Sequence, residues 1–147
     1  PGYCCVGCSK HNQHGLQLDF WYDEQNKEVI TKWNPKNHLQ GYVNVLHGGI
    51  QATILDEIAS WAVNVMLETG GVTSQLSIRY KKPVMVNSGE LTAKARILAT
   101  KNGWQTFTAN YSIRKNNYAH KQPFSTSYTL RKLQKRNWDF PEWKHSS

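Results

Sequence analysis

The feature that most constrains this fold is a long apolar segment that follows a His-Gly-Gly sequence at residues 47–49. From residue 50 to about residue 68, apolar side chains occupy most positions around a helical circumference, which is typical of a buried helix rather than one lying on a surface. Two glycines at residues 70–71 supply a stop. The polar exceptions recur at intervals of three and four residues and so form a narrow stripe: Thr53, Asp56 or Glu57, Ser60, Asn64 and Glu68.

The segments on both sides of this helix alternate in the manner of β-strands. Before it, residues 16–22 and 28–33 are predicted to form a hairpin, because turn-forming residues separate them. After it, four further strands are predicted between turn sequences: residues 72–86, 90–100, 104–115 and 118–132. This order predicts an α+β fold in which a curved antiparallel sheet of five to six strands wraps around one long central helix.

The length and composition favour a single soluble domain. A chain of 147 residues can bury a substantial core as one unit, so we expect one domain over residues 1–147. Within this domain, a turn-rich segment occupies residues 1–15 and a basic tail occupies residues 133–147. No apolar run approaches the roughly 20 residues that span a bilayer, and no signal-peptide pattern opens the chain. We therefore expect a cytoplasmic protein with no membrane partner.

The net charge of +8 is distributed unevenly. Residues 1–78 hold four lysine or arginine side chains against seven carboxylates, whereas residues 79–147 hold fourteen against three. Such a basic half often meets nucleic acid, a membrane or a phosphorylated small molecule, but exposed lysines also simply promote solubility. Trp104, Phe107 and Tyr111 could stack on bases, yet their alternation suits a core equally well. No recognisable nucleic-acid-binding module is present, so no nucleic acid partner is expected.

All three cysteines, Cys4, Cys5 and Cys8, lie near the start of the chain. An odd, clustered set makes a poor disulfide framework and agrees with a reducing compartment. Cys5-x-x-Cys8 has the spacing of half a zinc site, but no second cysteine pair follows, and His11 and His14 lack the usual finger spacing. We therefore expect packed or idle thiols here and no metal.

The start of the buried helix has the features of a site for a carbonyl oxygen. Glycine lets another molecule approach the backbone, and the first N–H groups of a helix have no intrahelical partner. An oxyanion near Gly49 would also be stabilised by the positive end of the helix dipole. Asp56 follows Gly49 by seven residues, which is about two turns and roughly 10 Å along nearly the same face. Because helical side chains lean toward the N-terminus, the Asp56 carboxylate is carried back toward those amides, which suits acyl transfer.

The same residues also have structural interpretations. A buried helix can carry an aspartate that caps, pairs with a basic strand residue or hydrogen-bonds Ser60 one turn further on. Two glycines before a helix are common in loops as well. The residue pattern by itself leaves both interpretations of Asp56 open.

Three stretches of the sequence carry a family resemblance: HLQGYVNVL, HGGIQATILDE and SQLSIRYKKPV. They contain the pattern HGG, six residues and then Asp, which residues 47–49 and Asp56 meet in full. Nearer the start, CVGCSKHNQHGLQL matches C-x-x-C-G-x-x-N-x-x-G-L, except that Ser9 replaces a glycine. In these features the chain resembles the PaaI-type acyl-CoA thioesterases of the hotdog-fold superfamily, from about Cys5 to Leu130.

The resemblance implies a fold, an assembly and a set of roles. The fold would be a hotdog whose sheets join edge to edge in a homodimer, with active sites at the dimer interface and further pairing into a tetramer left open. Asp56 would be the nucleophile or the general base that activates water. The N–H group of Gly49 would polarise the thioester carbonyl. His47 and Gly48 would shape the turn, with His47 orienting the loop rather than acting as the base.

Further expectations concern residues around this core motif. In some members a hydroxyl of the partner subunit assists from the start of the strand after the helix; Thr73 aligns best with it, and Ser74 is adjacent. Some members place an asparagine six residues before the histidine, where this chain has Gly41, and Asn44 is not an aligned replacement. Asp56 is preferred over Glu57 because Glu57 lies about 100° further round the helix.

The implied reaction is hydrolysis of an acyl-CoA thioester to a free acid and coenzyme A, with no metal and no cofactor. Candidate contacts for the substrate and its phosphates are Ser74, Arg79, Lys81, Lys82 and Lys101. A hotdog dehydratase would need a catalytic histidine on the helix, and this helix contains none after residue 47. A non-catalytic acyl-CoA-binding or sensor protein remains the open alternative.

Overall fold

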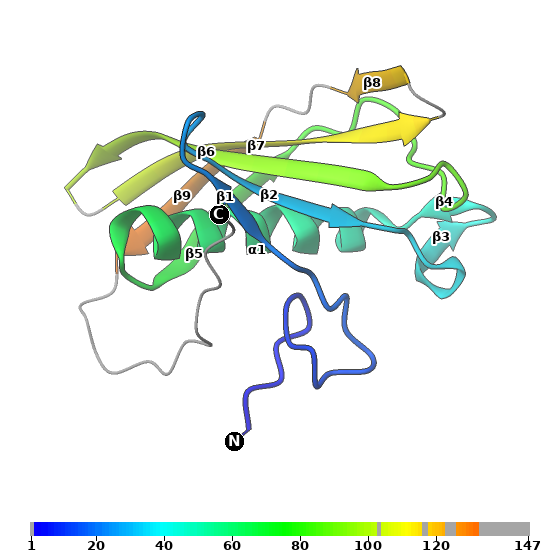
Figure 1. The fold of residues 1–147 in the computed structure, drawn as a ribbon, viewed down its shortest axis with the longest axis horizontal. Helices are drawn as coiled ribbons and strands as arrows, with labels where there is room; N and C mark the ends of the chain where they lie inside the picture. The colour runs from blue at the N-terminus through cyan, green and yellow to red at the C-terminus, as the bar shows by residue number, and fades with distance from the viewer. Residues whose placement is uncertain (1, 103, 116–117, 123–125, 133–147) are drawn as a thin grey trace.

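The computed structural model describes residues 2–102, 104–115, 118–122 and 126–132 (Figure 1). The tail predicted at residues 133–147 lies outside the described residues. In chain order the elements are β1 (Trp21–Asp23), β2 (Glu28–Trp33), a short 3-10 helix η1 (Asn37–Leu39), β3 (Gln40–Tyr42), β4 (Val45–Leu46), α1 (Gly48–Leu67), β5 (Gly71–Ile78), β6 (Leu91–Lys101), β7 (Trp104–Lys115), β8 (Tyr118–Gln122) and β9 (Thr126–Lys132).

Helix α1 is the buried helix that the sequence predicts. Along its length only Gly49 is exposed, and every other residue is buried or partly buried. The helix ends at Glu68, which takes the left-handed conformation with φ of 48° and ψ of 41°. The stop therefore comes from Glu68, two residues before the first of the two glycines that were expected to supply it. No helix in the described part of the chain is both long and apolar enough to cross a membrane.

An antiparallel sheet packs along α1, as Figure 1 shows. Its strands lie in the order β1-β2-β6-β7-β9-β5, and β8 pairs with β7 outside that path. Helix α1 contacts β2, β5, β6 and β7, so it lies along the middle of the sheet. The most buried apolar side chains come from both layers: Val29, Ile54, Leu55, Ile58, Val63, Leu91 and Phe107. The predicted plan of a sheet around one helix is confirmed, with seven strands in the described sheet instead of five to six.

The first predicted strand forms only in its last part, as β1. The residues before it form hydrogen bonds with the N-terminal segment instead. The N–H of Leu16 donates to the carbonyl of Val6 at 2.8 Å, and the N–H of Leu18 donates to the carbonyl of Gly7 at 2.9 Å. Gln17 between them has a φ of 54°, which a regular strand does not allow. The alternation in this stretch thus reflects two leucines buried under the N-terminal segment, not a longer strand.

The strand predicted for residues 72–86 also ends early, as β5 at Ile78. Its last residues, 84–86, pair with β4 and the turn before it. Two backbone hydrogen bonds hold them there, from the N–H of Leu46 to the carbonyl of Val84 (2.8 Å) and from the N–H of Val86 to the carbonyl of Asn44 (3.0 Å). Residues 79–83 are consequently released from the sheet and lie in neither strand.

Two other predicted segments are more divided than expected. The strand predicted for residues 118–132 is split into β8 and β9, with residues 123–125 outside the described residues. The split follows from the length of β7, because β8 pairs with its end, at residues 111–115, while β9 pairs with its beginning, at residues 104–107. The loop predicted at residues 38–46 contains most of η1 and a small two-stranded sheet of β3 and β4.

The contribution of the buried helix to stability can be tested at Ile58, which is 0% exposed. We expect Ile58→Ala to lower the free energy of unfolding by about 2–5 kcal/mol, because apolar contacts are lost and a cavity remains. Leu98→Ala, at an exposed position of β6, should change it by less than about 0.5 kcal/mol. Similar losses for both variants in chemical denaturation would contradict the placement of α1 in the core.

Candidate active site

His47 caps the start of α1. Its Nδ1 atom accepts a hydrogen bond from the N–H of Gly49 at 2.9 Å, and its carbonyl accepts one from the N–H of Ile50 at 3.1 Å. Because the first N–H groups of a helix have no intrahelical partner, these bonds stabilise the first turn. Nδ1 carries no proton in this arrangement, since it acts as the acceptor. His47 therefore acts here through the geometry of the turn.

Two glycines make room for the imidazole ring of His47. A Cβ atom added to Gly49 would lie 3.0 Å from Nδ1, and one added to Gly41 would lie 3.1 Å from Cδ2. Both distances are tighter than ordinary carbon contacts, so a larger residue would displace the ring. The N–H of His47 also donates to the carbonyl of Leu39 at 3.0 Å, which ties the loop to η1. Gly41, which stands where some members of the resembled family have asparagine, is thus explained by the ring beside it.

Asp56 faces strand β5. The hydroxyl of Thr73 donates to Oδ1 of Asp56 at 2.6 Å, and both side chains are partly buried. The sequence prediction placed this hydroxyl on a partner subunit, whereas here it comes from the same chain, because β5 follows α1 and packs against it. The register between β5 and β9 shifts between Thr73 and Gln75, a step that contains the exposed Ser74. A register shift of this kind changes the direction of nearby side chains, and this shift lies next to Thr73, whose hydroxyl binds Asp56.

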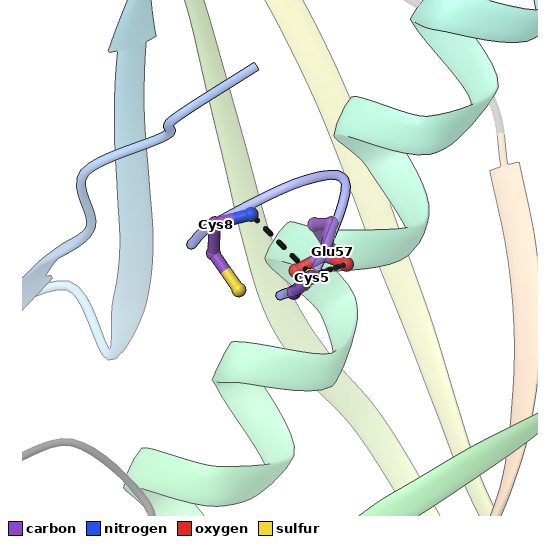
Figure 2. Close-up of side chains that lie close together, drawn as sticks. All are labelled: Cys5, Cys8 and Glu57. Atoms are coloured by element: carbon purple, nitrogen blue, oxygen red, sulfur yellow. Dashed lines mark hydrogen bonds between the residues drawn. The ribbon is translucent and has the colours of Figure 1, made fainter. Parts of the chain in front are cut away.

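The adjacent carboxylate, Glu57, points to a different part of the molecule. It lies against the N-terminal segment, where the thiol of Cys5 donates to its Oε1 atom at 3.0 Å (Figure 2). Cys8 lies in the same group, and burial raises the pKa of its thiol to about 12. Successive helical residues are about 100° apart, which accounts for the divergence. Of the two neighbouring carboxylates, Asp56 is therefore the one that reaches β5.

Tyr80 links the stretch after β5 to the start of α1, and sequence reasoning did not single it out. Its hydroxyl donates to the carbonyl of Gly48 at 2.8 Å. Burial raises the pKa of this hydroxyl, so it stays protonated and remains a donor. Its basic neighbours Arg79, Lys81 and Lys82 are exposed. The sequence feature that could have identified Tyr80 is an aromatic residue within a run of basic residues. The hydrogen bond of Tyr80 to Gly48 holds that basic run beside the start of α1.

The structure thus connects the predicted site residues in separate contacts rather than in one cluster. His47 meets Gly49 at the helix start, and Asp56 meets Thr73 two turns further along. Lys101 is exposed at the end of β6, on a different element from the basic run beside Tyr80.

The comparison with known families agrees with this geometry. Residues 43–116 match the family described as the thioesterase superfamily. The matched range covers half of the chain and includes all of α1 and β5. The chain therefore belongs to the thioesterase superfamily, and the resemblance found in the sequence is confirmed.

Individual relatives match over part of their length. The acyl-coenzyme A thioesterase THEM4 of Mus musculus is 31% identical over 70 residues, which are 48% of this chain and 30% of that protein. The uncharacterized mitochondrial membrane protein FMP10 of Saccharomyces cerevisiae is 30% identical over 70 residues, which are 46% of this chain and 29% of that protein. The similarity thus covers less than a third of the length of each of these two relatives.

Solved structures share the fold at lower identity. The BH2602 protein of Bacillus halodurans, whose crystal structure was determined with CoA, is 22% identical with a TM-score of 0.67. The match covers 87% of this chain and 83% of that chain. One long helix along an antiparallel sheet, in a chain of the thioesterase superfamily, is the hotdog fold that the resemblance implied.

The cap on α1 gives a direct stability test at His47. We expect His47→Ala to lower the free energy of unfolding by about 1 kcal/mol, because the N–H of Gly49 loses its acceptor. His47→Asn keeps a side-chain acceptor suited to a helix start and should recover most of that loss. Chemical denaturation of both variants checks this; equal losses would show that the acceptor at this position does not support the helix.

Proposed function

We propose that this chain hydrolyses acyl-CoA thioesters to a free acid and coenzyme A. The observation that carries the proposal is the position of Asp56, a partly buried carboxylate that Thr73 holds at 2.6 Å on the helix that begins with the His-Gly-Gly turn. Membership of the thioesterase superfamily supports the reaction class. The similarity to the acyl-coenzyme A thioesterase THEM4 over this region supports the substrate class.

Asp56 supplies the base in the proposed reaction. Thr73 donates to Oδ1 and thereby orients the carboxylate, which leaves Oδ2 to accept the proton of an attacking water. The water oxygen bonds to the carbonyl carbon, its proton passes to Asp56, and the carbon–sulfur bond then breaks. Coenzyme A leaves as its thiol when that proton is returned to sulfur. A direct attack by Asp56 would instead displace coenzyme A and form a mixed anhydride with the acyl group, and hydrolysis of that anhydride at the Asp56 carbon would leave heavy oxygen from labelled water in the enzyme after a single turnover.

The start of α1 supplies the donor for the carbonyl oxygen in this proposal. N–H groups at a helix start lie at the positive end of the dipole and stabilise negative charge that develops on that oxygen. Without substrate, the N–H of Gly49 donates to Nδ1 of His47 at 2.9 Å. The thioester oxygen would therefore compete with the imidazole for this N–H, and the cap would loosen as substrate binds.

The phosphates of coenzyme A would meet the basic run that follows β5. Tyr80 holds this run at the helix start through its bond to Gly48, and Arg79, Lys81 and Lys82 are exposed beside it. Charged donors of this kind bind phosphate oxygens strongly. The structurally similar BH2602 protein was solved with CoA, which supports a coenzyme A ligand for this fold.

We further propose a homodimer with active sites at its interface, as the family resemblance implies. The hydroxyl on Asp56 comes from the same chain, so a partner subunit would contribute to substrate binding rather than to holding the carboxylate. One domain over residues 1–147 and a cytoplasmic location remain predictions. The name of FMP10 places that relative in a mitochondrial membrane.

One observation favours a second function, the binding of acyl-CoA without hydrolysis. The N–H of Gly49 is already occupied by His47, and an oxyanion site that stays occupied would not stabilise a transition state. A binding protein of this kind would retain the basic run and the fold but show no turnover.

Replacing the carboxylate tests the proposed hydrolysis. We expect Asp56→Asn to reduce kcat by about 10²- to 10⁴-fold, because the proton acceptor is lost while the shape is kept. Thr73→Val should cause a smaller loss, since the carboxylate remains but is less well oriented. Glu68→Gln, which neutralises an exposed carboxylate at the end of the same helix, is the matched control and should leave kcat unchanged. Release of free thiol from a panel of acyl-CoA substrates measures all three.

The same panel separates the two functions. Binding of acyl-CoA with no thiol release for any acyl chain, short, long or aromatic, would reject hydrolysis in favour of the binding protein. Turnover that Asp56→Asn leaves intact would reject the role of Asp56.

If the basic run binds the phosphates, its removal should change KM for substrates that carry the nucleotide and leave KM unchanged for substrates that lack it. We expect the double variant Lys81→Gln, Lys82→Gln to raise KM for acyl-CoA by about tenfold, because two charge-assisted contacts to phosphate are lost. The KM for the matching N-acetylcysteamine thioester, which has no phosphates, should not change. Lys32→Gln with Arg96→Gln removes the same charge from exposed positions on β2 and β6 and serves as the control. An equal rise in KM for both double variants would point to a general charge effect.

A further inference from the structure

The N-terminal segment places a second group of reactive side chains against the middle of α1. The sulfur atoms of Cys5 and Cys8 and a carboxylate oxygen of Glu57 all lie within 4.8 Å of one another, and each residue is partly buried. Figure 2 shows the two cysteines of the loop meeting the glutamate that projects from the helix. None of these residues takes part in the proposed hydrolysis.

The loop around Cys5 is arranged to support a negatively charged sulfur. The N–H groups of Gly7 and Cys8 both donate to the Cys5 sulfur, at 3.3 Å and 3.4 Å. The hydroxyl of Tyr3 lies 3.1 Å from the Cys8 sulfur. Hydrogen bonds of this kind orient a metal ligand and tune its charge from outside the coordination shell.

The close approach of the loop to Glu57 requires glycine at residue 7. A Cβ atom added to Gly7 would lie 2.2 Å from Cγ and 2.4 Å from Cδ of Glu57, which no real contact allows. The loop is fixed on its other side, because the N–H of Leu18 donates to the carbonyl of Gly7 and Leu18 is buried in the core. The two cysteines are thus held over the carboxylate by packing on both sides.

Within the described residues, Glu57 forms no ion pair with a basic side chain. Neither of the two ion pairs in the described part of the chain includes it, and Lys10, the basic residue of the same loop, pairs with Asp19 at 2.7 Å instead. Instead, the carboxylate of Glu57 accepts a hydrogen bond from the thiol of Cys5. Two thiols and a carboxylate that share one small space form a set of ligands for a cation.

We propose that Cys5, Cys8 and Glu57 bind one Zn²⁺ ion, with a water molecule as the fourth ligand. Two thiolates and a carboxylate suit zinc, whereas magnesium and calcium prefer oxygen ligands alone. With zinc–sulfur bonds of 2.3 Å, tetrahedral geometry requires the sulfurs to be about 3.8 Å apart. The two sulfurs lie no more than 4.8 Å apart here, so they would need to approach by at most about 1 Å. Binding replaces the thiol protons, which are released to solvent because a coordinated thiol is deprotonated.

The ion would have a structural role. It would clamp the N-terminal segment to α1 at the residue that follows Asp56, and the hydrolysis proposed above passes through none of its ligands. The two proposals can therefore fail separately. The sequence did not predict this site because the third ligand comes from the helix, far from the Cys-x-x-Cys pair along the chain.

The test is zinc binding by the full chain, prepared reduced and without a histidine tag. Competition with a chromophoric zinc chelator should show one tight equivalent, and Co²⁺ should give the thiolate charge-transfer and tetrahedral bands of a two-sulfur site. Cys8→Ser and Glu57→Gln should each weaken zinc binding by at least about 10- to 100-fold, since loss of a direct ligand should cost no less than loss of a supporting group. Cys4→Ser is the matched control, because Cys4 is an exposed neighbouring thiol outside the group, and it should bind zinc like the parent chain.

Circular dichroism of each variant shows that the fold is retained, and the conservative Glu57→Gln keeps the proposal testable if a cysteine variant fails to fold. The hydrolytically impaired Asp56→Asn should bind zinc like the parent. Substoichiometric binding by the reduced parent would overturn the site. The site would also be overturned if Glu57→Gln bound zinc with unchanged affinity, or if Cys4→Ser lost as much zinc affinity as the ligand variants. A third contradicting result would be a mass showing a Cys5–Cys8 disulfide in the purified chain that zinc does not replace under reducing conditions.

Discussion

The structure depends on burying α1, a helix of twenty residues, within a chain of 147. Enclosing a helix on so many sides imposes a condition on its polar side chains, because a polar group removed from water is costly unless it finds a partner. Gln51 meets this condition by donating to the carbonyl of Leu46 at 3.0 Å, and Thr53 by donating to the carbonyl of Gly49 at 3.0 Å. A polar side chain of α1 is therefore satisfied either by the backbone of the helix itself, as Thr53 is, or by a neighbouring segment, as Gln51 is.

The two adjacent carboxylates show this condition at its strongest. Asp56 and Glu57 differ by about 100° in direction, so one neighbouring element cannot satisfy both. Strand β5 brings Thr73 to Asp56, and the N-terminal segment brings Cys5 to Glu57. The acid pair that looked anomalous in an apolar helix thus belongs to two separate sites on two sides of α1. One side holds the residues for the proposed chemistry, and the other holds the segment that encloses the helix.

Local sequence patterns predicted the parts of the fold that depend on local forces. Apolar periodicity predicted α1 to within two residues at its start, and the spacing from Gly49 to Asp56 predicted a shared face. The start of β1, the end of β5 and the start of β9 were not predictable in this way, because tertiary partners decide them. For example, Val84 pairs with β4, and Leu16 pairs with the N-terminal segment. Contacts between distant segments, such as Tyr80 with Gly48, had no signal of spacing at all. The helix could be predicted from its local sequence pattern, whereas the segments that surround the site are positioned by contacts between distant parts of the chain.

The early end of β5 has a consequence for the proposed site that a longer strand would not permit. A strand continuing through residue 83 would place Arg79 and Lys81 on one face of the sheet and Lys82 on the other, so that the two adjacent lysines would point apart. Leaving the sheet removes that alternation, and the bond from Tyr80 to the Gly48 carbonyl anchors the released stretch at the first turn of α1. The same first turn carries the N–H group that would meet the thioester oxygen. In the proposed site, a single tyrosine hydrogen bond would thereby anchor the basic run for the phosphates to the turn that carries the amide for the thioester, and it would do so with residues of one chain.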